Sequence, residues 1–188
     1  MKNLLLSLTA LFIFTSCAVS TYVIKESELL PYKESAQITR NTQQLQAFSL
    51  VNIRDKRNRL PIGKAYTGAK YSVTPIHLNT DLSQYLTGYF ENAFEMRNLK
   101  VDKTTEKASP LKMEIEVNHL WVEEVIEKFK PERAKCRVDM SFYLTGENKK
   151  WAGNFWTEFT SGGDLSDGTE RLAPTLASCM NALVEKVM

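Results

Sequence analysis

The sequence predicts an α+β fold: a two-layer sandwich in which two helices pack on one face of a mostly antiparallel sheet. Two stretches, residues 81–94 and the residues after 169, carry hydrophobic side chains at helical spacing. Between them, three runs alternate apolar and polar residues as strands do. The 188 residues, 43% of them hydrophobic and 24% charged, fit one globular domain.

The N-terminus predicts an export signal. Lys2 precedes an apolar run at residues 4–14, which would rise about 16 Å as a helix, too short for a hydrocarbon core of about 30 Å. The run ends in "FTSC", which resembles the bacterial lipobox and implies lipidation of Cys17. An ordinary signal peptide, with Cys17 left as a spare thiol, is the alternative. By the same resemblance, Ala18 directs the lipoprotein to the outer membrane, facing the periplasm.

The chain therefore divides into three parts. Residues 1–16 are predicted to be a lipoprotein signal peptide. Residues 17–45 are predicted to be the lipidated cysteine and a tether, either free or partly docked on the domain, because they show no sustained periodicity. Residues 46–188 form the single α+β domain. Several acyl chains on Cys17 would hold the domain at the membrane stably, since one chain alone binds only marginally.

The domain begins with a β-rich run at residues 47–53, which reads as the first strand. "RDKRNRLPIG" at residues 54–63 follows as a loop, and "KAYTGAKYSVTPI" after it is ambiguous because Gly68 and Pro75 interrupt strand-like residues. Thr80 can cap a helix that starts at Asp81. The apolar positions of this helix follow the i, i+3, i+4 series: Leu82, Tyr85, Leu86, Tyr89, Phe90, Ala93 and Phe94. A short strand is expected at residues 99–102.

The three alternating runs predict an antiparallel meander with one buried face. Met113, Ile115 and Val117 share one face of the first run, whereas Glu114 and Glu116 point the other way. Tyr143 and Trp156 fall in the polar phase of the second and third runs and are predicted to project away from the helices. Exposed aromatic residues can mark a binding surface. Cross-strand stacking on a solvated face, or cover by the tether, are the alternatives.

The last helix is predicted from about Thr169, with Pro174 in its first turn, where proline is tolerated. Cys179 lies on its apolar face, and Cys136 lies on the inward side of the second alternating run. The two thiols can meet across the layers, so Cys136 and Cys179 are a candidate disulfide in an oxidising compartment. The alternative is a pair of buried free thiols that pack as small hydrophobes.

Several of these segments together resemble the YajG-like family of bacterial lipoproteins. They are the lipobox at Cys17, the strand and charged loop "VNIRDKRNRLPIG", the helix "TDLSQYLTGYFENAFEMRNLKV", the strand "LKMEIEVNHLWV" and the C-terminal helix. The resemblance implies a fold like that of the N-terminal domain of TolB, whose relatives act by binding envelope components. It implies no reaction, so no catalytic residue is carried over.

The residues themselves contain no catalytic motif: nucleophile elbows, P-loops and dinucleotide fingerprints are absent from the sequence. The acidic stretch around Glu114 and Glu116 could supply paired carboxylates. These two residues occupy outward strand positions, however, where solvated charge is expected. We therefore expect no enzyme, no cofactor and no metal. The favoured function is an accessory envelope lipoprotein that binds or scaffolds a protein, lipid or polymer. The alternative is a small-ligand or glycan-binding lipoprotein with a pocket between helix and sheet.

The basic loop offers a second candidate binding surface, through Arg54, Lys56, Arg57 and Arg59. Nucleic acid is not an expected partner, because the chain is exported, its net charge is only +2 and no second segment matches the loop in basic density. Lipid phosphates or an acidic partner could bind the four cations. A solvated loop remains the alternative.

Overall fold

The computed structural model describes residues 21–29, 47–58, 61–67, 72–97, 99–102, 110–128, 131–148, 150–162 and 168–188. The signal peptide, Cys17 and Arg59 lie outside these residues. The described elements, in chain order, are β1 (Tyr22–Ile24), the 3-10 helix η1 (Glu26–Glu28), β2 (Ser49–Asp55), β3 (Gly63–Thr67), β4 (Ser72–Leu78), α2 (Leu82–Met96), β5 (Lys112–Val125), β6 (Arg133–Thr145), β7 (Lys150–Thr160), the 3-10 helix η3 (Gly168–Arg171) and α3 (Leu172–Val187).

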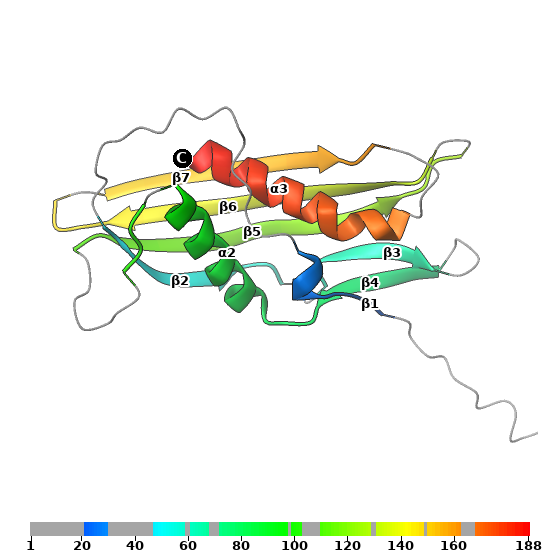
Figure 1. Ribbon diagram of the computed structural model, residues 1–188, viewed down its shortest axis with the longest axis horizontal. Coiled ribbons are helices and arrows are strands. Elements are labelled where there is room, and N and C mark those ends of the chain that lie inside the picture. Colours follow the sequence, from blue (N-terminus) through cyan, green and yellow to red (C-terminus); the bar gives the residue numbers. More distant parts are fainter. Residues whose placement is uncertain are drawn as a thin grey trace, which may run out of the picture.

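The predicted two-layer architecture is confirmed, with α2 and α3 on the same face of one sheet (Figure 1). Six strands follow the order β1-β4-β3-β5-β6-β7. The seventh, β2, lies outside this order and pairs with β5. The long pairings, β5 with β6 and β6 with β7, are antiparallel, as expected. The pairings β1–β4, β2–β5 and β3–β5 are parallel, which was not expected. Between β2 and β5 lie β3, β4 and α2, a connection long enough for parallel pairing.

The ambiguous segment after the basic loop forms the antiparallel hairpin β3–β4. The register of β1 begins only at Ile76, so Pro75 lies on a stretch of β4 with a described strand on one side alone, where a sheet tolerates proline. Gly63 starts β3, and a Cβ atom there would lie 1.7 Å from the carbonyl oxygen of Val122. Only glycine lets the backbones of β3 and β5 approach so closely.

Part of the range expected to be tether is built into the sheet. Tyr22–Ile24 forms β1 beside β4, and the side chains of Ile24 and Leu29 are buried. These residues pack because their apolar side chains complete the core at the β4 edge. Among the described residues, neither helix combines the length and the unbroken hydrophobicity that a membrane span requires.

Both predicted helices are present, with starts shifted from the predicted residues. Asp81, and not Thr80, caps α2: its Oδ1 accepts a hydrogen bond from the Gln84 amide at 3.0 Å. α3 begins at Leu172 after the turn η3, and Pro174 lies in its first turn as expected. The expected strand at residues 99–102 is reduced to one bridge between Val101 and Phe48.

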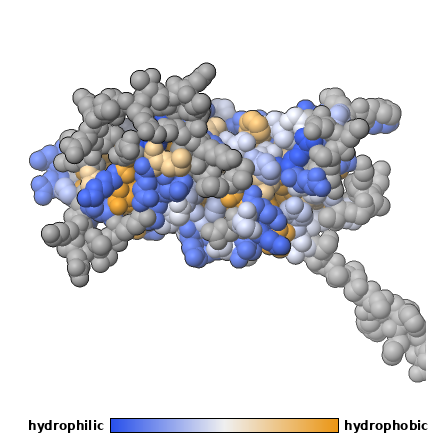
Figure 2. Space-filling view, viewed as in Figure 1, coloured by the Kyte–Doolittle hydropathy of each residue, from blue (hydrophilic) through white to orange (hydrophobic). Residues whose placement is uncertain are grey.

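The core lies between the helices and the inner sides of β5 and β6, and its alternation matches the prediction. Met113, Ile115 and Val117 of β5 are buried, as is Phe142 of β6. A register shift between Val117 and His119 then changes the phase of β5. The buried side chains beyond it are those of Leu120, Val122 and Glu124. Where the described residues are visible from the helix side, hydrophobic residues form small patches between hydrophilic ones (Figure 2).

Candidate functional site

On the outer face, opposite the helices, two predicted basic residues and one predicted aromatic residue meet around Glu116. Because β2 runs parallel beside β5, Arg54 lies next to Glu116 in the register, and Tyr143 of β6 lies next to Glu114. Lys56 Nζ is 2.6 Å from Glu116 Oε2, the Tyr143 hydroxyl donates to the same oxygen at 3.0 Å, and Arg54 is 3.8 Å from Glu114. Hydrogen bonding by Lys56, and then by Tyr143, holds the pKa of Glu116 below its usual range.

The rest of this outer face continues the same pattern of cross-strand polar pairs. Hydrogen bonding to Glu123 raises the pKa of Lys64 above its ordinary value. Cations and anions alternate across the face, so it is not a positive track of the kind a polyanion requires. The pairs are Lys64 with Glu123 at 3.1 Å, Lys135 with Glu158 at 2.9 Å, and Asn118 with Asp139 at 3.3 Å and with Ser141 at 2.8 Å.

Trp156 projects from the outer side of β7, as predicted, and is 54% exposed. Two cations flank its ring: the guanidinium of Arg137 lies 5.8 Å from the ring centroid and Lys186 Nζ lies 5.1 Å from it. Lys186 also donates to the Trp156 carbonyl oxygen at 2.7 Å. Sequence reasoning missed both cations. Arg137 lies in the polar phase of β6, so its place on the outer face could have been predicted from the sequence. The approach of Lys186 to the Trp156 ring depends on where α3 ends over β7, which the sequence does not indicate.

Arg57 does not join this outer face. Its guanidinium forms two hydrogen bonds with the carboxylate of Asp55, at 2.8 and 2.7 Å, and a third with the Leu120 carbonyl oxygen at 2.9 Å. Its side chain is only 7% exposed. Along β5, the register of β2 ends at Val117 and that of β3 begins at Val122. Arg57 therefore donates to a backbone carbonyl that lies in the gap between the two strands. The positive charge of Arg57 is already neutralised by Asp55.

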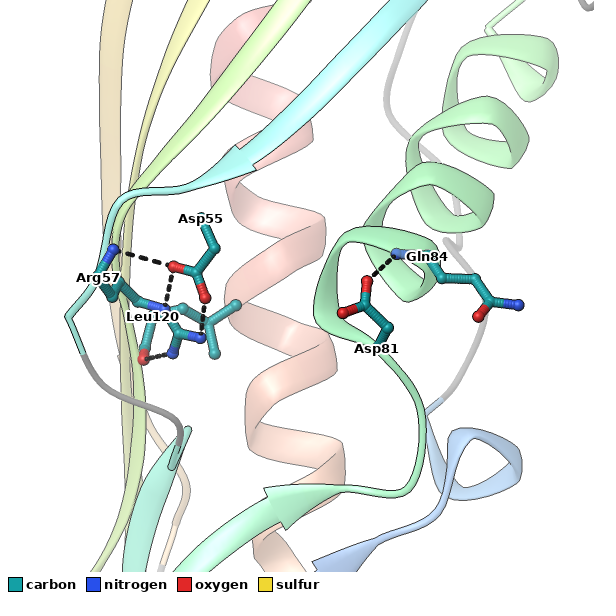
Figure 3. Close-up of polar contacts among 5 residues, drawn as sticks. All are labelled: Asp55, Arg57, Asp81, Gln84 and Leu120. Carbon is teal, nitrogen blue, oxygen red and sulfur yellow. Dashed lines mark hydrogen bonds and ion pairs between the residues drawn. The ribbon is translucent and has the colours of Figure 1, made fainter.

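Beside Arg57, a pocket of about 430 Å³ opens between the end of β2, the end of β4 and the start of α2. Figure 3 shows the Asp55–Arg57 pair on one side of this region and the Asp81 cap of α2 on the other. Carboxylates, an imidazole and a hydroxyl line the pocket and could hydrogen-bond a polar molecule. Its lining residues are Asp55, Arg57, Asn58, Ile62, His77, Leu78, Thr80, Asp81 and Leu82.

The two cysteines of the domain face each other across the layers, as the sequence predicted, and both are free buried thiols. Burial raises the pKa of Cys136, whereas hydrogen bonding by Cys136 lowers the pKa of Cys179. The Thr157 hydroxyl donates to the Cys179 carbonyl oxygen at 2.9 Å and lies 3.7 Å from its sulfur. The candidate disulfide between these two residues stays a prediction.

No protein-family model matches the chain. No curated protein matches it either.

Solved structures with a similar fold do exist. A Xanthomonas campestris protein of the family DUF330 matches with a TM-score of 0.58 at 11% identity, over 88% of this chain and 91% of that one. An uncharacterised protein matches with a TM-score of 0.52 at 11% identity, over 89% and 97%. A minor lipoprotein from Acinetobacter baumannii gives a TM-score of 0.39 at 10% identity, over 76% and 87%, too low to support an argument. The first two matches establish a shared fold and nothing further, and the resemblance to the YajG-like family stays a prediction.

Proposed function

We propose that the chain is a non-enzymatic lipoprotein of the bacterial envelope, anchored through Cys17 in the outer membrane and facing the periplasm. Its domain binds a protein partner through the outer face of β5, β6 and β7. One observation carries the proposal: Tyr143 and Trp156 are exposed on the face that neither α-helix covers. Tyr143 is hydrogen-bonded to Glu116, which is ion-paired with Lys56, and the cations of Arg137 and Lys186 flank the ring of Trp156. The lipobox at Cys17 supports the envelope role.

The charge pattern favours a protein over a lipid surface or an anionic polymer. The outer face carries both signs in alternation, as in Lys56–Glu116 and Lys135–Glu158. A polyanion would need a field of one sign, whereas a protein surface can match both signs position by position. Aromatic residues are also enriched at protein interfaces.

The test uses the full chain, solubilised from membranes with its anchor. We expect the variant Tyr143→Ala/Trp156→Ala to recover much less of a partner after crosslinking and pull-down than the parent chain. The control is Met96→Ala, which removes an exposed apolar side chain from the helix side. If the double variant recovers the same partner in the same amount, the outer face is not the binding surface.

The pocket beside Arg57 supports a second candidate function, the binding of a small polar ligand such as a glycan fragment. Asp55 and Asp81 both line it, which places two carboxylates around one cavity. Titration with soluble fragments of envelope glycan, followed by NMR, tests this function. We expect shifts at His77 and Thr80 that disappear in Asp81→Asn. The absence of shifts in the parent chain would exclude a glycan ligand.

A further inference from the structure

Among the described residues, β7 is an edge strand of eleven residues that neither a bulge nor a proline interrupts. Its register with β6 runs from Lys150 to Thr160 without a bulge, and it contains no proline. Within the described part of the chain, β6 is the only strand that pairs with it. Natural sheets usually shorten, bulge or interrupt such an edge, because its open backbone groups pair readily with another strand.

The hydrogen-bond pattern shows which backbone groups are directed away from β6. The Ser161 amide donates to the Ala134 carbonyl, so this pair is hydrogen-bonded, and such pairs alternate along an antiparallel ladder. The even-numbered residues of β7 therefore direct their N–H and C=O groups outward. Lys186 donates to the Trp156 carbonyl oxygen from outside the ladder, which agrees with this assignment. A second strand that pairs at Trp156 takes the place of Lys186 at this carbonyl.

We propose that β7 pairs antiparallel with β7 of a second copy of this chain, with the two-fold axis at Asn154. In this register Lys150 lies opposite the partner subunit's Glu158, and Glu158 lies opposite the partner subunit's Lys150. Opposite charges facing each other across a strand pair are stabilising. No other antiparallel register of β7 with itself brings these two residues opposite each other.

The other even-numbered residues of β7, whose side chains lie on the outer face, fit the same register. Trp156 lies opposite the partner subunit's Ala152, whose small side chain leaves room for the indole. Asn154 lies opposite its own copy, and a side-chain amide can both donate and accept a hydrogen bond. The interface is isologous and closed, so it produces a dimer and not a fibre. A foreign peptide strand would have no reason to match the spacing between Lys150 and Glu158.

The first experiment is site-directed crosslinking of the full chain in membranes under mild oxidation. Asn154→Cys places two thiols at the two-fold axis, so we expect a disulfide-linked dimer. The matched control is Ser141→Cys, which lies beside Asn154 on the inner neighbour β6, one strand further from the axis. We expect no crosslink from this control. Failure of Asn154→Cys to crosslink overturns the proposal.

The second experiment tests the register by charge exchange. Lys150→Glu alone places like charges opposite each other at both ends of the interface, as does Glu158→Lys alone. We expect each to weaken the dimer by at least fivefold in sedimentation of the full chain in detergent. Mixing the two variants restores opposite charges at every pair, so we expect a heterodimer from the mixture. The proposal is refuted if the parent chain is monomeric in sedimentation. It is also refuted if Lys150→Glu leaves the strength of dimerisation unchanged. Either outcome leaves the outer-face function standing, because that function is tested separately by partner recovery with Tyr143→Ala/Trp156→Ala.

Discussion

In β6, the side chains that face the helices and those on the outer face differ completely, although they alternate along one strand. Cys136, Val138 and Met140 are buried without measurable exposure, whereas Arg137 between them is exposed and Asp139 is partly exposed. The buried side chains gain stability from packing in the core. Exposed ion pairs contribute little to stability. We infer that the inner face holds the fold together and that the outer face is available for recognition.

The test with the largest expected effect on stability compares two neighbouring aromatic residues of β6, one on each face. Phe142 is fully buried and contacts Phe90 and Phe155 edge-to-face, with centroid distances of 5.6 and 5.9 Å. We expect Phe142→Ala to lower the free energy of unfolding by about 3–5 kcal/mol in urea titrations, because it leaves a cavity. Tyr143→Ala should cost under about 1 kcal/mol. Equal losses would contradict the division of roles between the faces.

The second test concerns the two buried cysteines, because a disulfide between them would join the inner face of β6 to α3. We expect oxidation with diamide to join Cys136 and Cys179, with loss of two hydrogen atoms in the intact mass. The bond should stabilise the domain by about 2–4 kcal/mol, because it restricts the unfolded chain. Cys136→Ser is the control and should not respond to diamide. Unchanged mass in the parent protein would show that the two thiols stay reduced.

The third test separates two cations of the same loop. Arg57 turns inward and donates to the Leu120 carbonyl oxygen, whereas Lys56 pairs with Glu116 on the outer face. Arg57→Ala leaves Asp55 and the Leu120 carbonyl without this donor, so we expect a loss of about 1–3 kcal/mol in the free energy of unfolding. Lys56→Ala should change it by less than about 0.5 kcal/mol. The midpoints of thermal unfolding report both, and the reverse order would contradict these assignments.

The smallest effect is a pH dependence on the outer face. Because the folded-state pKa of Glu116 is lowered, its contribution to stability is present above the unfolded-state pKa and is lost as the pH falls through the folded-state pKa. Lys56→Ala removes the main cause. We therefore expect the Glu116 pKa, followed by NMR, to rise toward its ordinary value in this variant. An unchanged pKa would mean that Lys56 does not act on Glu116.

Local sequence patterns predicted which face the residues of β6, β7 and the first half of β5 occupy, because period-two alternation depends only on neighbouring positions. The outward placement of Tyr143 and Trp156 and the inward placement of Cys136 follow from it, whereas the inward placement of Cys179 follows from the helical spacing of apolar residues in α3. The change of phase at Asn118 could not be predicted this way, because the alternation before it gives no sign of a bulge. The hairpin β3–β4 was also hidden, since Pro75 is tolerated only where β1 leaves one side of β4 open.

By itself, the sequence determined the α+β class, the two helices and the two faces of the long strands, because these depend on the local spacing of apolar side chains. Tertiary structure alone decided how the basic loop is divided. Arg54 and Lys56 meet the acidic residues of β5 because β2 lies parallel beside that strand. Arg57 turns inward because β2 and β3 leave a carbonyl of β5 between them without a strand partner. Both outcomes depend on pairing between strands about 60 residues apart in the chain, which local periodicity does not specify.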